Sequence, residues 1–322
     1  MKISKDIRIV FMGTPGFAVE SLKALVEGAY NVVAVVTVPD KPAGRGQKVR
    51  MSEVKQYALE HDLPVLQPEK LKTPEFVEAL RSFKADLQIV VAFRMLPEIV
   101  WAMPKMGTFN LHGSLLPNYR GAAPLNWALI NGDKKTGVTT FLLKHEIDTG
   151  NLLFQESIDI DLYDNVGTVH DKLMVIGASL VCKTVDALAS GDVAPMDQDK
   201  MIAEGAVSNH APKIFKADCQ VSSGLSVMDF HNKVRGLSPY PAAWIALNDG
   251  DKKYTAKLFS TIPSVESHTD PIGQVVQDKD MLRVSLKDGY VWFEEMQLAG
   301  KKRMKTVQFI NGFRIEKELI LA

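Results

Sequence analysis

The first part of the chain alternates short apolar runs, rich in β-branched residues, with segments whose apolar residues recur at helical spacing. Runs at 7–12, 32–38 and 87–92 predict strands, and the segments 17–27 and 52–60 predict helices. Strand and helix alternating in this way are typical of a parallel sheet covered by helices. We therefore expect an α/β fold at the amino-terminal side, with a Rossmann-like, doubly wound parallel sheet.

The pattern changes after a long apolar segment at 166–189, which predicts a helix. A polar stretch with Gly191 and Pro195 follows, and beyond it the chain reads as short strands separated by turns. Such a texture favours a small β-barrel. We predict a catalytic domain at 1–190, a linker at 191–207 and a smaller β-barrel domain at 208–322.

Composition agrees with two globular domains and changes the picture little. The chain has 322 residues, of which 46% are hydrophobic and 24% charged, enough to bury two cores. The longest apolar runs in the sheet region are too short to span a membrane, so no membrane partner is expected. Only about six residues precede the first strand, and two cysteines, Cys182 and Cys219, indicate no disulfide framework. We expect a cytoplasmic protein.

Charge is balanced overall but unevenly placed. The formal net charge is zero, which argues against simple coating of nucleic acid. Residues 208–322 carry 16 Lys and Arg against 13 Asp and Glu, leaving 22 against 25 in residues 1–207. The densest basic cluster lies in a predicted turn and contains Lys301, Lys302, Arg303 and Lys305. It could bind phosphates, or it could be the solvated tip of a hairpin.

The most informative residues are an amide, an imidazole and a carboxylate. Asn110 and His112 alternate with Leu111 in the segment T-F-N-L-H, so in a strand both polar side chains point to one face. Asp148 follows a second strand-like run, 136–144, which we expect to end at the same edge of a parallel sheet. Ligands of such sheets bind at the carboxyl ends of the strands. The three side chains therefore predict one site with a donor, a base and an orienting carboxylate.

Other site classes have weaker support. The turn Gly13-Thr14-Pro15-Gly16 follows the first strand but lacks the G-x-G-x-x-G spacing of a dinucleotide site, and the chain has no G-x-x-x-x-G-K-[ST] phosphate loop. His145-Glu146 has no second histidine four residues on, and the other histidines are scattered. We expect neither a nicotinamide cofactor nor a metal.

Several motifs in order, N-x-H, S-L-L-P, Y-R-G-A-A-P and D-T-G, resemble those of the 10-formyltetrahydrofolate-dependent formyltransferases. The resemblance runs from I-V-F-M-G-T-P-G-F (9–17) through A-P-K-I (211–214) to R-G-L-S-P-Y-P-A-A-W (235–244). It implies that the small barrel is OB-like and holds a transfer RNA. It also implies formyl transfer, with 10-formyltetrahydrofolate as the donor co-substrate.

Formyl transfer to an amine gives each of the three residues a role. The Asn110 amide can donate to the oxyanion that develops on the formyl group. His112 can accept the amine proton, directly or through water, and Asp148 can hold its tautomer and support the imidazolium. In this sequence Lys144, His145 and Glu146 precede the D-T-G motif, a departure from the pattern of many relatives that could alter the local charge.

The resemblance also implies a folate pocket. Its expected lining comes from two segments, S-L-L-P and 90–96, and consists of Ser114, Leu115, Leu116, Pro117, Phe93 and Leu96. A rigid apolar turn with one hydroxyl suits one edge of such a pocket. At one position the chain departs from the family, because Phe93-Arg94 replaces the Tyr-Gly that is common in relatives. A large cation at Arg94 could change the affinity for the donor.

The acceptor is implied by a basic loop at 39–50 and by the basic cluster near the carboxyl terminus. The loop resembles the one with which the family probes an acceptor stem, and the expected phosphate contacts are Lys41, Arg45, Lys48, Arg50, Lys301, Lys302 and Arg303. The resemblance, and not the charge pattern, implies methionyl initiator transfer RNA as the partner, and we expect a monomeric enzyme. Glycinamide ribonucleotide or a nucleotide-linked amino sugar remains an alternative acceptor, and a catalytically silent RNA-binding protein a third hypothesis.

Overall fold

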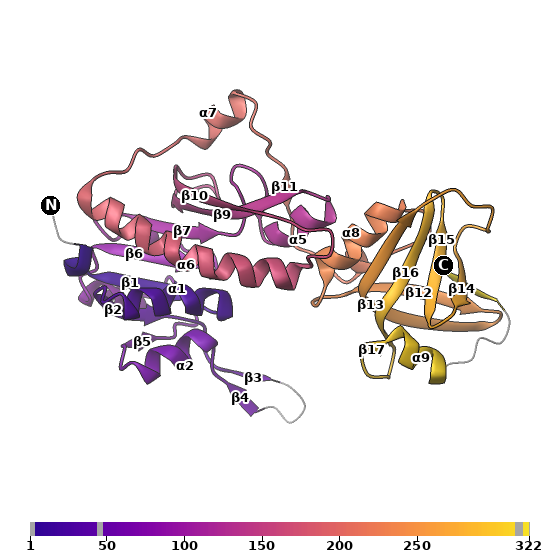
Figure 1. Cartoon of the computed structure of the whole chain (residues 1–322). Coiled ribbons are helices and arrows are strands. Elements are labelled where there is room, and N and C mark those ends of the chain that lie inside the picture. Colours follow the sequence, from indigo (N-terminus) through magenta and orange to yellow (C-terminus); the bar gives the residue numbers. More distant parts are fainter. Residues whose placement is uncertain (1–3, 44–47, 313–317, 322) are drawn as a thin grey trace. The chain divides into compact units, whose positions relative to one another are not determined.

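The computed structural model describes residues 4–43, 48–312 and 318–321 (Figure 1). Contacts between residues divide the chain into two compact units. Unit 1 comprises Met1–Gly121, Gly137–Ile158 and His170–His210, and unit 2 comprises Ala122–Thr136, Asp159–Val169 and Ala211–Ala322. The chain thus passes between the units several times, whereas we predicted a single passage through a linker at 191–207.

Unit 1 is built on a seven-stranded sheet in the order β10-β9-β7-β6-β1-β2-β5. The five strands from β7 to β5 are parallel, and every residue of the central strands β1 and β6 is buried. The Rossmann-like prediction is confirmed. The strands of this sheet are β1 (Ile9–Gly13), β2 (Val32–Val36), β5 (Val65–Leu66), β6 (Leu87–Val91), β7 (Thr108–His112), β9 (Lys135–Leu142) and β10 (Leu152–Asp159).

One strand beside the expected site runs against our prediction. β9 pairs with β7 in antiparallel fashion, with Leu142 opposite Phe109 and Thr139 opposite His112. The end of β9 therefore lies at the amino end of β7, and the expectation that it would end at the carboxyl edge of a parallel sheet was wrong. A strand pattern does not encode direction, and here the loop between β9 and β10 returns Asp148 to the carboxyl edge of β7.

Helices cover the sheet, and two of them begin at a side-chain cap. The Ser52 side chain caps α2 by accepting from the Lys55 amide, and the Asp197 carboxylate caps α7, as is typical at helix starts. The helical segments with residues in unit 1 are η1 (Ser4–Asp6), α1 (Gly16–Glu27), α2 (Glu53–Glu60), α3 (Pro74–Ser82), α4 (Glu98–Trp101), α6 (Val166–Ser190) and α7 (Gln198–Ala203).

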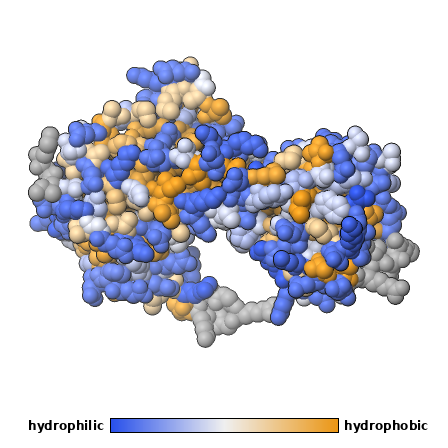
Figure 2. All heavy atoms as spheres, viewed as in Figure 1, coloured by the Kyte–Doolittle hydropathy of each residue, from blue (hydrophilic) through white to orange (hydrophobic). Residues whose placement is uncertain are grey.

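Helix α6 is the longest element of the described residues. By length and composition alone it could cross a membrane, with a mean hydropathy of 1.6 over an 18-residue window. Figure 2 shows hydrophobic residues gathered over the middle of unit 1, where α6 runs in Figure 1. Its inner face nevertheless packs on the sheet, since Gly177 abuts Leu111 and Thr184 bonds to Thr140. Core helices of this kind pass the same test, so a membrane role gains little support.

Unit 2 contains a closed antiparallel barrel. Its strands follow the order β13-β12-β18-β14-β15-β16, and β13 also pairs with β16, which closes the ring. β17 adds to β16 at one side. The predicted OB-like barrel is confirmed. The strands are β12 (Ala243–Asp249), β13 (Lys252–Val265), β14 (Gln274–Asp278), β15 (Met281–Leu286), β16 (Gly289–Leu298), β17 (Met304–Lys305) and β18 (Leu319–Leu321).

The remaining helices of unit 2 pack around this barrel. α8 places Phe230 and Val234 in the barrel core, with Phe230 stacked on Phe293 of β16. Its start is capped by Ser226. Apolar residues recur at helical spacing at 227, 230, 234 and 237. The prediction of short strands and turns for 208–322 did not include this helix. The segments are α5 (Pro124–Ile130), η2 (Ala217–Cys219), α8 (Val227–Leu237) and α9 (Thr306–Gly312). A separate two-stranded sheet consists of β8 (Arg120–Gly121) and β11 (His210–Ala211).

Candidate active site

The two polar residues of β7 lie on one face at its carboxyl end, as predicted. Asn110 is half-buried, and its side chain makes no hydrogen bond to another described residue. His112 is 7% exposed and packs edge-on against Phe141. A buried histidine therefore stands beside an amide whose donors are uncommitted.

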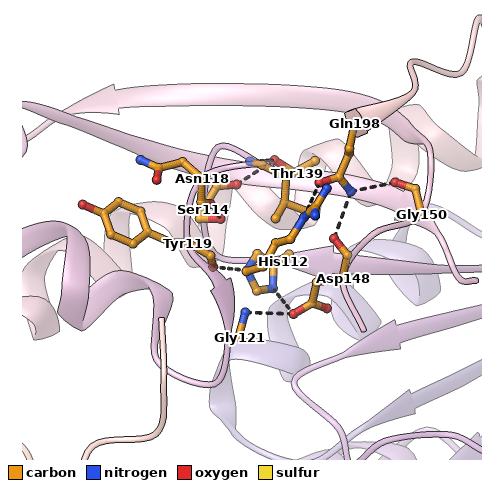
Figure 3. Close-up of polar contacts among 11 residues, drawn as sticks. His112, Ser114, Asn118, Tyr119, Gly121, Thr139, Asp148, Gly150 and Gln198 are labelled. Atoms are coloured by element: carbon orange, nitrogen blue, oxygen red, sulfur yellow. Dashed lines mark hydrogen bonds and ion pairs between the residues drawn. The ribbon is translucent and has the colours of Figure 1, made fainter. Parts of the chain in front are cut away.

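Both ring nitrogens of His112 face acceptors (Figure 3). Nε2 lies 3.0 Å from the Tyr119 carbonyl oxygen, and Nδ1 lies 3.9 Å from Oδ2 of Asp148. A carbonyl oxygen only accepts, so the hydrogen of the neutral ring is on Nε2. Nδ1 then has a free lone pair, and a proton gained there would face the Asp148 carboxylate.

The Asp148 carboxylate is held from a second direction. Its Oδ2 accepts a hydrogen bond of 3.0 Å from the Gly121 amide. Asp148 itself adopts φ 55°, the left-handed region in which an aspartate is better tolerated than most residues. The loop thus turns the side chain toward His112 and its own carbonyl the other way.

Left-handed residues gather around this site. Ala92 directly follows β6, Tyr119 supplies the carbonyl to His112, and Asp148 supplies the carboxylate; their φ angles are 46°, 62° and 55°. Several other non-glycine residues with positive φ follow helices or lie in turns of the barrel, where such a conformation is common. Strained backbone at three points of one site is a recognised mark of function.

The glycine of D-T-G has a steric reason to be glycine. A Cβ on Gly150 would lie 1.5 Å from the Leu142 carbonyl oxygen, closer than any side chain tolerates. The carbonyls of Gly150 and Asp148 both accept from Nε2 of Gln198, at 2.7 and 2.9 Å. Gln198 falls within the predicted linker at 191–207. The local sequence signal for its helix is the capping residue Asp197 directly before it.

The S-L-L-P segment forms a tightly bonded turn. Ser114 is fully buried, and its hydroxyl donates to the Asn118 carbonyl at 2.6 Å. Leu116 and Pro117 are buried and Leu115 is half-buried, while the Leu116 carbonyl accepts from Gln155. The Ser114 hydroxyl is therefore used within the turn, and the segment offers apolar surface and backbone groups.

The other predicted folate segment follows β6. Leu96 is buried and Phe93 half-buried against the core of the sheet. The Arg94 guanidinium donates to the carbonyls of Glu69, at 2.7 Å, and Pro68. Burial lowers the pKa of Arg94 from its usual value. This cation thus ties two loops of unit 1 together.

The basic loop is a hairpin rather than an irregular loop. β3 (Lys41–Ala43) and β4 (Lys48–Arg50) pair antiparallel, and the Asp40 carboxylate at its base binds Lys55 at 2.6 Å. Lys41 and Arg50 are exposed, without an ion pair to another described residue. Arg45 lies outside the described residues, as does the side chain of Lys48.

A cavity of about 320 Å³ opens beside this hairpin. It borders the turn after β1, the end of β4 and the start of α2, and its lining is mostly polar: Thr14, Pro15, Arg50, Met51, Ser52, Glu53 and Gln56. Gly13 pairs with Val91, and Val91 with Leu111, so β6 alone separates β1 from β7. Two strand spacings amount to about 10 Å.

In unit 2 the predicted basic cluster lies in the turn between β16 and β17. Lys301 and Lys302 are exposed. Arg303 pairs with Glu295 at 2.5 Å and stacks over the Phe259 ring at 4.2 Å. Of the three cations predicted to contact phosphate, Lys301 and Lys302 thus stand in solvent, and Arg303 supports the barrel. Among the described residues, no group of three or more His, Cys, Asp or Glu could hold a metal.

Comparison with known proteins identifies both parts of the chain. A formyl transferase family model matches residues 7–185, and a formyl transferase C-terminal domain model matches residues 213–314. A methionyl-tRNA formyltransferase of Bacteroides thetaiotaomicron is 56% identical over 313 residues, covering 97% of both chains. One of Flavobacterium psychrophilum is 45% identical over 309 residues, covering 96% of both.

Solved structures share the fold at low identity. A sugar 3N-formyl transferase studied with dTDP and 5-N-formyl-THF gives a TM-score of 0.64 at 18% identity, covering 92% of this chain and 99% of its own. An N-formyltransferase from Helicobacter canadensis, in complex with folinic acid and dTDP-3-aminofucose, gives 0.62 at 17%, covering 92% and 100%. By its family models and its relatives, the chain belongs to the formyl transferase family, among the methionyl-tRNA formyltransferases.

Proposed function

We propose that this enzyme transfers a formyl group from 10-formyltetrahydrofolate to the α-amino group of methionyl initiator transfer RNA. One observation carries the proposal: His112 lies between the Tyr119 carbonyl and the Asp148 carboxylate, beside the uncommitted amide of Asn110. Relatives with the name of this activity are 56% identical over almost the whole chain, which supports the acceptor.

The proposed chemistry follows from these contacts. The attacking amine must lose a proton, and the lone pair on Nδ1 of His112 takes it, directly or through a water molecule. The resulting imidazolium faces the Asp148 carboxylate on one side and donates to the Tyr119 carbonyl on the other. The Asn110 amide donates to the oxyanion of the tetrahedral intermediate, an interaction worth about 3 to 4 kcal/mol when preorganised.

The folate donor is proposed to occupy the space between the S-L-L-P turn and the segment after β6. The half-buried Leu115 and Phe93 offer apolar contacts from the two segments, and the buried Leu116, Pro117 and Leu96 support them from behind. Ala92, exposed and left-handed, turns the chain where backbone groups can meet the heterocycle. Ser114 supports this turn from within, since its hydroxyl is bonded to Asn118.

The acceptor is proposed to approach from the hairpin β3–β4. The polar cavity beside Arg50 suits the ribose, base and phosphate of a terminal nucleotide, and it lies about two strand spacings from β7. The ribose and the amino-acid ester attached to it would together extend from this cavity toward β7 and bring the amine to His112. Lys41, Arg45, Lys48 and Arg50 are the proposed phosphate contacts, with Lys301 and Lys302 in unit 2.

The domain roles follow from the same proposal. Residues 1–190 carry out catalysis, 191–207 lead to the second domain and pack α7 on unit 1, and 208–322 hold the transfer RNA. The proposed enzyme is a cytoplasmic monomer without a membrane partner, and it needs no metal.

The proposal is tested by transfer of labelled formyl from 10-formyltetrahydrofolate. Methionyl initiator transfer RNA, methionyl elongator transfer RNA and a nucleotide-linked amino sugar serve as parallel acceptors. We expect labelling of the initiator alone. Labelling of the sugar alone would replace the acceptor, and an unlabelled set would reject the proposed activity. An Asp148→Asn variant with full activity would reject the role of that carboxylate.

A further inference from the structure

We infer that Gln198 is a positioning residue that holds the catalytic carboxylate loop in its reactive geometry, and that the segment around α7 therefore belongs to the catalytic centre. The inference rests on the proposed function. Gln198 is only 1% exposed, although it lies in a polar stretch between the two regions matched by the family models.

The Gln198 amide is used at both ends (Figure 3). Its Nε2 donates to the Asp148 and Gly150 carbonyls, at 2.9 and 2.7 Å, and its Oε1 accepts from Nε of Arg120 at 3.0 Å. Only one orientation of the amide satisfies two carbonyls and one guanidinium. The side chain thus spans the loop 148–150 and the strand β8.

These two segments are the ones that place the carboxylate. Arg120 directly precedes Gly121, whose amide donates to Oδ2 of Asp148. Gln198 therefore bonds to the Asp148 backbone. It also bonds to Arg120, the residue next to Gly121, whose amide binds the Asp148 carboxylate. Because Asp148 is left-handed, a conformation that most residues avoid, external bonds to its carbonyl favour the loop as it stands.

The helix is itself fixed to the same loop. The Met196 backbone exchanges two hydrogen bonds with Leu152, the first residue of β10, at 2.8 and 2.9 Å. Met201 packs on Leu116, Phe141 and Leu152. Gln198 thus lies in a segment that is itself packed against unit 1, not in an unattached linker.

A glutamate at position 198 would fit the space but could not donate the two hydrogen bonds. Gln198→Glu keeps the length and the acceptor for Arg120, but it removes both donors and sets a carboxylate against two carbonyl oxygens. We expect kcat to fall on the order of 100-fold, as for a displacement of about 1 Å in a catalytic group. KM for folate and for transfer RNA should stay within roughly twofold, because no substrate contact is lost.

Two readouts separate positioning from general loosening. In an Asp148→Asn background, Gln198→Glu should add less than about twofold, because both changes act through one carboxylate. Asp197→Ala, which removes the cap of the same helix and none of the Gln198 bonds, should leave kcat within about threefold although it weakens the helix start. Equal losses in Asp197→Ala and Gln198→Glu would overturn the inference.

A measurement without substrate keeps this inference distinct from the proposed activity. Hydrogen exchange of the Gly121 amide reports its bond to Asp148, and we expect protection to fall about tenfold or more in Gln198→Glu. Unchanged protection would overturn the inference, whatever the enzyme does. Reduced protection in a protein that transfers no formyl would support the positioning role and reject the proposed function. If Gln198→Glu does not fold, Gln198→Met, which keeps the volume and lacks the donors, serves for the same measurements.

Discussion

The loops around His112 and the basic hairpin β3–β4 use their polar groups in opposite ways. Around His112, Ser114, Tyr119, Asp148 and Gln198 are bonded to other parts of unit 1. On the hairpin, Lys41 and Arg50 are exposed and pair with no other described residue. Proton transfer requires fixed distances, whereas a phosphate backbone is bound by exposed charge. The first region therefore holds its groups at fixed distances, as the proposed proton transfer requires. The second presents exposed positive charge, as the proposed binding of phosphates requires.

The largest expected effect follows from removing His112, the residue at the centre of the first region. His112→Ala should lower kcat by about 10²- to 10⁴-fold, since it removes the proposed base. It also leaves the Tyr119 carbonyl without its donor, at a cost of about 1 to 3 kcal/mol. Single-turnover transfer of labelled formyl measures the first effect and thermal unfolding the second. A folded variant with near-normal turnover would remove His112 from the mechanism.

The second prediction disrupts the loop between β9 and β10 without removing any of the proposed catalytic side chains. Gly150→Ala should destabilise unit 1 by at least about 3 kcal/mol, because the new Cβ would overlap the Leu142 carbonyl and the backbone must move. Gly312→Ala is the control: no atom of the neighbouring described residues lies within 4 Å of the added Cβ, and a helical site should tolerate it. Similar unfolding midpoints in denaturant for the two variants would contradict the steric argument.

The third prediction concerns the exposed cations. Arg50→Ala should raise KM for transfer RNA roughly three- to tenfold and reduce the slope of log affinity against log salt by about one, with little change in folate binding. Titrations at several salt concentrations measure the slope. An equal loss of folate affinity would contradict a contact limited to the acceptor.

The same division can be tested within one turn of unit 2. Lys301→Ala should weaken transfer RNA binding by a few-fold and leave stability unchanged, because that side chain stands in solvent. Arg303→Ala should mainly lower stability, by about 1 kcal/mol, because it loses Glu295 and the Phe259 ring. Binding and unfolding assays on both variants decide this, and a reversed pattern would reassign Arg303 to the acceptor.

The smallest expected effect concerns His231, a buried histidine of unit 2 that is not among the proposed catalytic residues. Burial, and to a lesser extent Arg235, lower the pKa of His231 from its usual value near 6.5. Its folded form resists protonation, so its contribution to stability is complete above pH about 6.5 and is lost as pH falls toward the folded pKa. His231→Gln should flatten the decline of the unfolding midpoint between pH 7 and 5. A decline of unchanged steepness in His231→Gln, measured by thermal unfolding at several pH values, would contradict this assignment.

The sequence predicted the catalytic pair because strand alternation is local. Asn110 and His112 share a face in any strand, whatever its neighbours. Asp148 was predicted for a reason that proved wrong, since β9 is antiparallel to β7 and strand direction depends on distant pairing. Gln198 was missed because a single glutamine in a polar stretch carries no motif, and its burial depends on how α7 docks. The Ser114 hydroxyl carried no sign that Asn118 would accept its hydrogen.

The return loop between β9 and β10 also bears on how acceptor choice could change. Its tip, residues 144–147, is exposed, with Ile147 at 65%, while Asp148 and Gly150 are held by Gln198. Substitutions or insertions at the tip need not disturb the anchored half, because a solvent-exposed loop tip tolerates such changes. The loop thus separates a fixed chemical half from a variable outer half. A designer could graft new sequences between residues 144 and 147 and select for other amines, with the carboxylate retained.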